Sequence, residues 1–260
     1  MAFRNLTIAD NRAIRRIEIN RPDKLNALNR ETLNELHAAF DQARHDDAIR
    51  VVIMAGSGEK AFIAGADIAE LASLTTQQAQ MFSATGQALM TKIERLGKPV
   101  IARIQGYALG GGMELAMSCH FRLASENARL GQPEINLGVI PGFGGTQRLL
   151  RLAGRGPALE LCLTGAQIDA RRALALGIVN HVVPPEQLDQ EVDDLAVRLA
   201  ACAPHALSGI LDSVLVGGEC GIDAGLEFET KAFALCFSTQ DMREGTSAFL
   251  ERRKPSFSGN

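Results

Sequence analysis

Short apolar runs alternate with helical patterns along the first two thirds of the chain. Residues 49–55 and 99–105 are almost continuously apolar and each run is followed by glycine, which is typical of strands buried on both faces. Residues 14–20 predict an earlier strand, and Leu123 and residues 179–183 predict later strand positions. The first part of the chain therefore contains several strands of a buried sheet.

Helical patterns separate these strands. Residues 31–44 carry apolar side chains three or four positions apart, which places them on one helix face (Leu33, Leu36, Ala39, Phe40 and Ala43). Residues 75–96 predict a second helical segment, and its apolar side chains either line a pocket or pack in the core. Strands that alternate with helices indicate an α/β fold, in which ligand-binding turns collect on one side of a parallel sheet.

The pattern changes after Pro184-Pro185, where only helical segments follow. They span residues 187–203, 205–215, 222–237 and 238–252. Ser238 with Asp241 resembles an N-terminal capping pair for the last of these helices. We therefore expect a core of residues 1–200 with the active site, and a helical C-terminal region of residues 201–260 that packs over the core or a neighbouring subunit.

Composition narrows the class of protein. The 260 residues are 46% hydrophobic and 22% charged, which suits a globular protein with a sizeable core. A net charge of −3 gives no electrostatic footprint for nucleic acid. Five cysteines without CxxC spacing argue against a disulfide framework or a zinc site and favour a reducing compartment. The sequence has no membrane-length apolar run and no signal-peptide core, so we expect a cytoplasmic protein that binds no membrane.

Two glutamates beside glycine turns indicate the chemistry. Glu114 follows three glycines at residues 110–112, and Glu134 stands twenty positions later, after Gly-Gln-Pro at residues 131–133. Glycine lets a ligand approach the main chain, and a helix that begins after the glycine run points its positive end at that ligand. Each feature alone is weak, because glycine clusters are usually turns and glutamate is favoured in any first helical turn. Together they suit acid/base chemistry beside a carbonyl that becomes an enolate.

Other enzyme classes lack their motifs. No GxGxxG follows the first strand, and Gly-Phe-Gly-Gly at residues 142–145 lacks the spacing of a dinucleotide-binding turn. A phosphate-binding loop is excluded because Gly-Lys-Ser/Thr is missing. The sequence has no His/Cys/Asp cluster with metal-ligand spacing, so we expect no metal.

Six segments in order carry a resemblance to the enoyl-CoA hydratase (crotonase) family. They are Asn20-Arg21-Pro22, Leu25-Asn26-Ala27-Leu28, residues 61–68, residues 106–116, residues 131–135 and residues 141–148. The resemblance spans essentially the whole chain and implies the family fold. That fold is an α/β crotonase-type spiral of ββα repeats with a C-terminal helical trimerisation region, assembled as a homotrimer or as a homohexamer made of two trimers.

The resemblance also implies an activity and the roles of individual residues. The protein would be a lyase that adds water to a trans-2-enoyl-CoA in fatty-acid β-oxidation and gives 3-hydroxyacyl-CoA. Ala66 and Gly111 would donate backbone N–H groups to the thioester oxygen, Glu114 would deprotonate the added water, and Glu134 would deliver a proton to Cα. Coenzyme A is part of the acyl-CoA thioester substrate, so no separate cofactor is expected. The implied substrate-binding residues are Lys24, Leu25, Ala27, Ala64, Asp67, Ile68, Leu109, Gly110 and Pro133.

Two positions depart from the family pattern. His120 stands where an aspartate commonly follows the cysteine, and we interpret it as a surface or capping residue rather than a catalyst. Phe143 stands where many relatives carry a smaller residue, and it narrows the acyl end of the pocket under this interpretation.

Alternatives remain open at the level of sequence. Within catalysis they are an enoyl-CoA isomerase or a hydratase for a branched, carboxylated enoyl-CoA of the methylglutaconyl type. Outside catalysis the crotonase fold could serve as a binding module, for RNA among other ligands, although the acidic balance argues against it. Because both glutamates are present, hydration is favoured. The sequence leaves the acyl chain, the trimer-or-hexamer choice and the pathway undecided, and the pathway could be fatty-acid, amino-acid or aromatic degradation.

Overall fold

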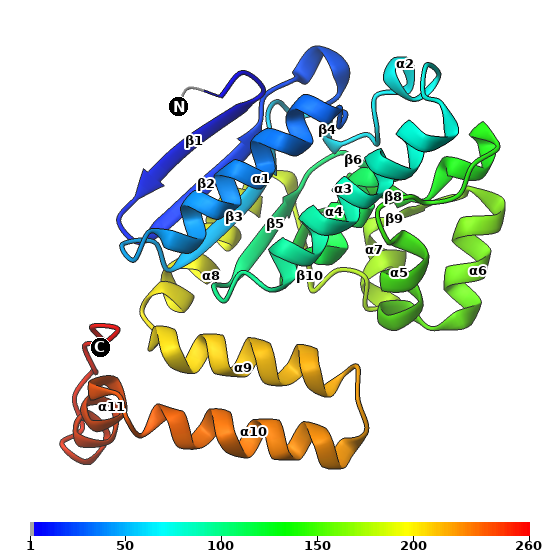
Figure 1. Ribbon diagram of the computed structural model, residues 1–260. Helices are drawn as coiled ribbons and strands as arrows, with labels where there is room; N and C mark the ends of the chain where they lie inside the picture. Colours follow the sequence, from blue (N-terminus) through cyan, green and yellow to red (C-terminus); the bar gives the residue numbers. More distant parts are fainter. Residues whose placement is uncertain (1–2) are drawn as a thin grey trace.

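The computed structural model describes residues 3–260 and contains two sheets whose strands alternate along the chain (Figure 1). The large sheet has the order β1 (Leu6–Asn11), β2 (Ile14–Ile19), β3 (Val51–Gly56), β5 (Val100–Ile104), β7 (Phe121–Ser125) and β10 (His181–Val183). The small sheet has the order β4 (Ala61–Ile63), β6 (Tyr107–Leu109), β8 (Arg129–Gly131) and β9 (Gln167–Asp169). All pairs are parallel except β1 with β2 and β8 with β9.

The chain winds through these sheets as a spiral of repeated units. β3, β5 and β7 each lie in the large sheet and are each followed directly by β4, β6 and β8 in the small sheet. A helical segment then returns the chain to the next turn of the spiral. Since the same loop is repeated, the turns that follow β4, β6 and β8 gather at one edge of the small sheet, which is where the site lies.

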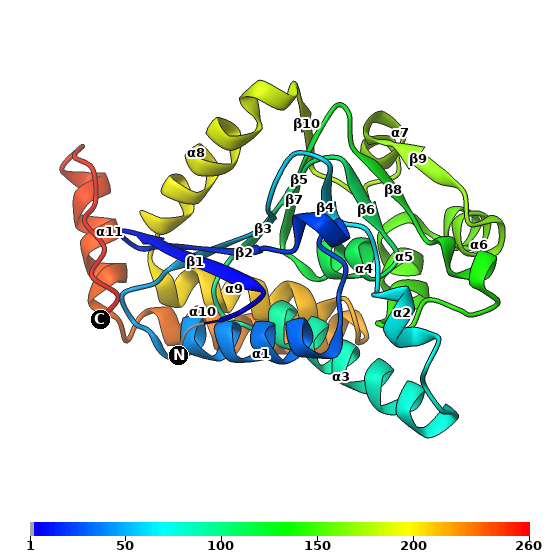
Figure 2. The ribbon, with the colours of Figure 1, turned by 90° about the horizontal axis from the view of Figure 1, so that it is seen from above.

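Helices cover both faces of the large sheet (Figure 2). All six residues of β3 are buried. Val52 and Met54 pack in the cluster that contains α1 and α3, while Val51 and Ile53 pack with residues of α8 on the opposite face. Alternate side chains thus point to opposite helix layers, which explains why this strand is apolar at every position rather than at every second one.

Side-chain caps set the start of the two long helices on the first face. Asn29 accepts a hydrogen bond from the N–H of Thr32 at the start of α1, and Thr75 with Gln78 forms a capping box at the start of α3. The helical segments of the core are η1 (Pro22–Lys24), α1 (Arg30–His45), α2 (Ile68–Leu71), α3 (Thr76–Glu94), α4 (Gly111–Ser118), η2 (Pro133–Leu137), α5 (Gly145–Ala153), α6 (Arg155–Thr164), α7 (Ala170–Ala175), η3 (Pro185–Gln187) and α8 (Leu188–Ala200).

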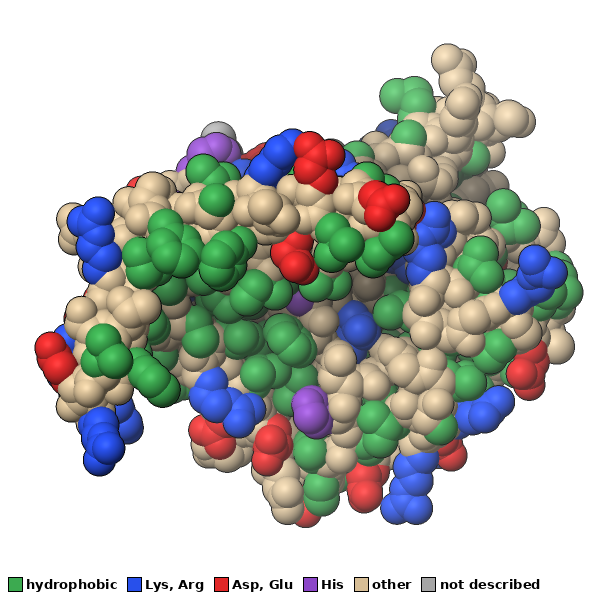
Figure 3. Space-filling model, turned by 90° about the horizontal axis from the view of Figure 1, so that it is seen from below, with side chains coloured by type: hydrophobic (Ala, Val, Ile, Leu, Met, Phe, Trp, Pro, Cys, Tyr) green, Lys and Arg blue, Asp and Glu red, His purple; other side chains and the backbone are tan. Residues whose placement is uncertain are grey.

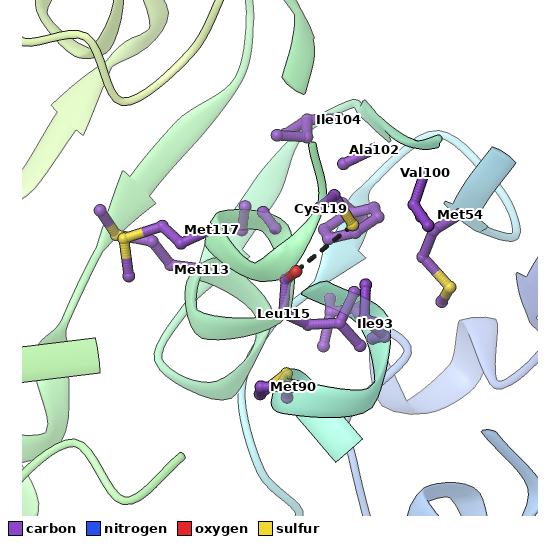
Figure 4. Close-up of a cluster of buried hydrophobic side chains, with 14 of the residues drawn as sticks. Met54, Met90, Ile93, Val100, Ala102, Ile104, Met113, Leu115, Met117 and Cys119 are labelled. Atoms are coloured by element: carbon purple, nitrogen blue, oxygen red, sulfur yellow. Dashed lines mark hydrogen bonds between the residues drawn. The ribbon is translucent and has the colours of Figure 1, made fainter. Parts of the chain in front are cut away.

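The short helix α4 is enclosed on all sides. Every one of its eight residues is buried. Figure 4 shows Leu115 and Cys119 packed toward Met90 and Ile93 of α3 and toward the strand β5. Helix α4 is therefore held rigidly, and its N-terminus has a fixed position in the fold.

The C-terminal helices project from the core. Helices α9 (Pro204–Gly217) and α10 (Ile222–Cys236) form an antiparallel hairpin below it, and α11 (Gln240–Leu250) lies beside the chain end (Figure 1). Neither helix of the hairpin contains a buried residue. Within residues 3–260 no single helix is long and apolar enough to cross a membrane, although the bent pair of residues 185–200 and 204–217 meets that length and composition when both halves are joined.

Most predicted elements are confirmed, with ends shifted by a few residues, but two expectations are wrong. Ser238 and Asp241 do not cap α11, because the side chain of Thr239 accepts the hydrogen bond from the N–H of Met242. Asp241 is buried and instead accepts from the N–H groups of Ser258 and Gly259. The expected single sheet is two sheets, and β1 and all four strands of the small sheet were not predicted as strands.

Candidate active site

The glycine run 110–112 forms the turn between β6 and α4. Gly110 is the N-terminal cap residue, with φ of 50° and ψ of −122°, a conformation that favours glycine. Its N–H donates to the carbonyl of Gly131 at 2.9 Å. At Gly112 a Cβ would overlap the carbonyl oxygen of Ile63 on β4. The glycines thus serve a sharp turn and a close approach of α4 to the small sheet, and they expose the backbone of Gly111 at the helix start.

A second backbone donor lies beside this turn. The N–H of Leu28 donates to the carbonyl of Gly65, and the N–H of Asp67 donates to the carbonyl of Leu28, both at 2.8 Å. Ala66 lies between these two bonded residues, Gly65 and Asp67, in the chain. Within residues 3–260 the N–H groups of Ala66 and Gly111 donate to no protein acceptor. The two segments lie side by side because β4 pairs with β6. The geometry therefore brings two free amides to the positive end of α4.

Glu114, in the first turn of α4, is held by a second glycine turn. Its Oε1 accepts from the N–H groups of Phe143 at 2.8 Å and Gly145 at 2.6 Å. Glu114 as a whole is 1% exposed. Burial raises the pKa of Glu114 to about 7 and the neighbouring Glu134 adds to the rise, while the two amide bonds and Arg148 oppose it.

Glu134 lies over the first glycine turn. It is the second residue of η2, and a Cβ at Gly110 would come 2.5 Å from its Oε1. With its amide turned to donate, Gln132 places Nε2 3.1 Å from Oε2 and 3.2 Å from Oε1 of Glu134. Burial raises the pKa of Glu134 to about 7 as well. Two carboxyl groups that both titrate near neutral pH can exchange the roles of proton donor and proton acceptor.

Sequence reasoning missed the role of the turn at residues 142–145. The turn was quoted within a family motif and weighed against dinucleotide-binding spacing, but the contact of its amides with Glu114 was not predicted. Gly144 has φ of 99°, and a Cβ at Gly145 would come 2.9 Å from Oε1 of Glu114. Glycines at both positions therefore allow the turn to close on the carboxylate, and the Gly-x-Gly-Gly pattern was the signal that could have pointed to it.

The predicted substrate-binding residues fall into two groups. The first group lies on residues 24–27 and 64–68, two segments that hydrogen bonds join. The N–H of Ala64 donates to the carbonyl of Leu25 at 3.0 Å. Leu25 and Ile68 are exposed apolar side chains on either side of this junction. The same junction contains the remaining predicted residues of these segments, Lys24, Ala27 and Asp67. The second group, Leu109, Gly110 and Pro133, lies where β6 meets β8, with Leu109 opposite Gly131.

Asp67, a predicted substrate-binding residue, forms an ion pair within the chain. Its carboxylate is 2.9 Å from Nη2 of Arg21, and this hydrogen bond and charge lower the pKa of Asp67. Nη1 of Arg21 also donates to the carbonyl of Ala27. Arg21 thus ties the two segments together, a role that sequence reasoning did not assign to it although it stands within a quoted motif.

His120 is a capping residue, as predicted. Its Nε2 is 3.0 Å from the carbonyl of Glu94, the last residue of α3, and its Nδ1 accepts from the N–H of Val100 at 2.9 Å. Burial lowers the pKa of His120, so the ring is neutral and fixed in one tautomer. It takes no direct part in the site.

The chain is similar to enoyl-CoA hydratases in both sequence and structure. Residues 9–260 match the family model described as enoyl-CoA hydratase/isomerase. The chain is 46% identical to a crotonyl-CoA hydratase of Syntrophomonas wolfei, with 99% of both chains covered, and 44% identical to a short-chain-enoyl-CoA hydratase of Clostridium acetobutylicum, with 98% and 97% covered. Its structure matches that of an enoyl-CoA hydratase from Bacillus anthracis with a TM-score of 0.96 and 38% identity, covering 99% and 100% of the two chains.

Proposed function

This chain belongs to the enoyl-CoA hydratase/isomerase family and acts as an enoyl-CoA hydratase, and from that premise we propose how its residues add water to short-chain trans-2-enoyl-CoA. The observation that carries the proposal is the pair of buried carboxyl groups, Glu114 and Glu134, beside two backbone N–H groups without protein acceptors. Hydration needs all four groups, whereas a double-bond shift needs only one carboxylate.

The thioester oxygen binds the N–H groups of Ala66 and Gly111. Glu114 removes a proton from water while the water oxygen bonds to Cβ. The π electrons of the Cα–Cβ double bond move toward the thioester carbonyl, whose oxygen takes up the negative charge of the enolate. Glu134 then delivers a proton to Cα, which gives 3-hydroxyacyl-CoA. Each amide donor is worth about 10²–10³ in rate and each positioned acid or base about 10²–10⁴.

Coenzyme A enters as part of the substrate, and we propose that no separate cofactor or metal takes part. The junction of residues 24–27 with 64–68 binds it, with the exposed side chains of Leu25 and Ile68 on the adenine side. Leu109, Gly110 and Pro133 line the path toward Gly111. Main-chain groups and apolar surface dominate this path, which explains the small residues of the motifs.

A short acyl chain is supported by the place of Phe143. Its ring packs against Phe82, with centroids 5.2 Å apart, and fills the space that a side chain at Gly86 on α3 would take. On the other side, a Cβ at Gly111 would come 3.2 Å from Cε2 of Phe143. The ring therefore stands beside the oxyanion amide and limits the length of the chain that follows the thioester.

A homotrimer or a homohexamer is supported by the C-terminal hairpin. Figure 3 shows hydrophobic side chains gathered on the face where α9 and α10 lie. The exposed ones are Ile210, Val214, Val216, Ile222, Leu226, Phe233 and Leu235. Ile210, Val214 and Phe233 also line a groove of about 740 Å³. An apolar face of this kind is covered when subunits associate, and native mass spectrometry of the purified protein distinguishes monomer, trimer and hexamer.

A cytoplasmic location is supported by the cysteines. All five are free thiols, and the two most exposed ones, Cys202 and Cys220, have no disulfide partner. Free exposed thiols suit a reducing compartment.

The assay is loss of the conjugated enoyl-thioester absorbance when the protein meets crotonyl-CoA, with the product identified as 3-hydroxybutyryl-CoA. Loss of absorbance that weakens with longer enoyl-CoAs supports the short-chain proposal. Conversion of a 3-enoyl-CoA to a 2-enoyl-CoA without hydration would favour the isomerase, and activity restricted to a carboxylated branched substrate would favour the methylglutaconyl type. No reaction with any of these thioesters would favour a binding module.

A further inference from the structure

The turn at residues 142–145 makes hydrogen bonds on its outer side as well as to Glu114. The carbonyl of Gly142 accepts from Oγ of Ser83 at 2.5 Å and from Nε2 of Gln87 at 3.0 Å, both on α3. The carbonyl of Phe143 accepts from Nη1 of Arg148 at 2.9 Å. Both carbonyls next to the Phe143 amide are therefore bonded to side chains, so the direction in which this amide points is fixed.

Arg148 is itself held in a defined geometry. Its Nε and Nη2 donate to Oε1 and Oε2 of Glu94 at 2.7 Å and 2.8 Å, a two-point ion pair between α5 and the end of α3. The Arg148 side chain is 14% exposed and that of Glu94 25%. A Cβ at Gly144 would overlap Nη1 of Arg148, so the guanidinium lies directly against the turn. Arg148 thus joins three parts of the molecule, namely α3, α5 and the turn.

We propose that Arg148, anchored by Glu94, is a positioning residue for Glu114: by fixing the turn at residues 142–145 it aims the amides of Phe143 and Gly145 at the carboxylate. The proposal rests on the proposed function, in which Glu114 removes the proton from water. Arg148 makes no contact with the reacting atoms in this scheme and acts through the turn. A two-point guanidinium–carboxylate pair gives this kind of orientational restraint, which a lysine cannot reproduce.

Arg148 also acts through its charge. The charged or titratable groups around Glu114 are Glu134 on η2, Arg148 on α5, Glu94 on α3 and Cys162 on α6. Of these, Arg148 opposes the rise in the pKa of Glu114 that burial and Glu134 cause. Removing the positive charge should therefore raise that pKa further, and less of Glu114 would be ionised at neutral pH.

The test separates position from charge with three variants assayed on crotonyl-CoA. Arg148→Met removes both the hydrogen bonds that fix the turn and the positive charge. We expect kcat to fall by about 10²-fold, the order expected for a misplaced catalytic group. The acidic limb of the kcat–pH profile should move to higher pH. Arg148→Lys keeps the charge, so kcat should fall while the limb stays in place. Glu94→Gln should lower kcat by less and move the limb, if at all, to lower pH. KM should change little in all three.

Arg151→Met is the matched control. Arg151 stands on the same helix and makes the same two-point pair with a glutamate, Glu219, but it is half exposed and bonds no part of the turn. It should keep the wild-type kcat and pH profile.

The proposal is overturned if the Arg148 and Glu94 variants keep the wild-type kcat and limb, or if Arg148→Lys restores full activity. The proposal is also overturned if the loss of kcat among the variants only parallels their loss of melting temperature and the acidic limb of the kcat–pH profile does not move in Arg148→Met. If Arg148→Met does not fold, Glu94→Gln and Arg148→Lys decide. A wild-type protein without hydratase activity would instead refute the proposed function, and the two failures are thus distinguishable.

Discussion

The active-site end of the core and the C-terminal hairpin differ in which of their groups lack a partner within the chain. Around Glu114 the amides of Phe143 and Gly145 donate to the carboxylate, and within residues 3–260 the amides of Ala66 and Gly111 have no protein acceptor. In the hairpin no residue of α9 or α10 is buried, and large apolar side chains of both helices are exposed. Under the proposed function, a substrate completes the first region and a second copy of the chain covers the other, so mutations in the two regions should affect different measurements.

The sharpest test of this contrast is Glu114→Gln. The amide oxygen of glutamine can still accept from Phe143 and Gly145, so the fold should persist while the base is lost. We expect kcat on crotonyl-CoA to fall by about 10²–10⁴-fold with little change in KM or in the native mass. Glu227→Gln, on the exposed side of α10, is the control and should be fully active. Full activity in Glu114→Gln would contradict the assigned mechanism.

The same carboxyl group should make stability depend on pH. The pKa of Glu114 rises from 4.5 to about 7 on folding, so between these pH values the folded state holds a proton that the unfolded state has lost. Stability is therefore greatest below pH 4.5 for this group and is lost as pH rises through about 7, by at most about 3 kcal/mol.

Urea unfolding at pH 5 and pH 8, at constant protein concentration, measures this difference. Glu114→Gln should reduce the fall in the free energy of unfolding between the two pH values, while Glu227→Gln should leave it unchanged. An equal fall in all three proteins would show that Glu114 ionises freely in the folded state.

The two regions also differ in how well the sequence predicted them. The strands β3 and β5 follow from nearly continuous apolar runs, and helix α1 follows from apolar side chains at helical spacing, because these elements pack against several neighbours in the core. Helices α8–α11 were also predicted, although neither α9 nor α10 contains a buried residue. The strands of the small sheet have only three residues each, too few to show a period of two. Their pairing depends on partners far along the chain.

Within the site, the glutamates and glycines were visible in sequence, but their supports were not. Gly145 and Phe143 hold Glu114 through main-chain N–H groups, which every residue except proline possesses. Arg21 and Arg148 look like ordinary surface charges until the fold places Asp67 and Glu94 beside them. Tertiary hydrogen bonds of this kind leave almost no local signal.

A charge in the hairpin should change assembly without changing the chemical step. Val214 is 69% exposed on α9 and lines the apolar groove. Burying a glutamate at this place in a subunit interface is unfavourable, so Val214→Glu should shift the native mass toward the monomer. Val197→Glu, on α8 and also exposed, is the matched control and should keep the wild-type mass. An unchanged oligomer in Val214→Glu would place the interface elsewhere.

The smallest expected effect concerns chain length at the edge of the site. Phe143→Ala removes the ring that stands beside Gly111 but keeps the amide that holds Glu114, so the proposed catalytic groups should stay in place. The freed volume equals a few methylene groups, each worth about 0.8 kcal/mol when buried. We expect the ratio of kcat/KM for octenoyl-CoA over crotonyl-CoA to rise roughly 10-fold, which corresponds to about 1.4 kcal/mol in transition-state binding. Since the ring of Phe143 packs on Phe82 and Gly86 of α3, the native mass should not change. An unchanged ratio would mean that another side chain limits the acyl pocket, and residues of α3 would be tested next.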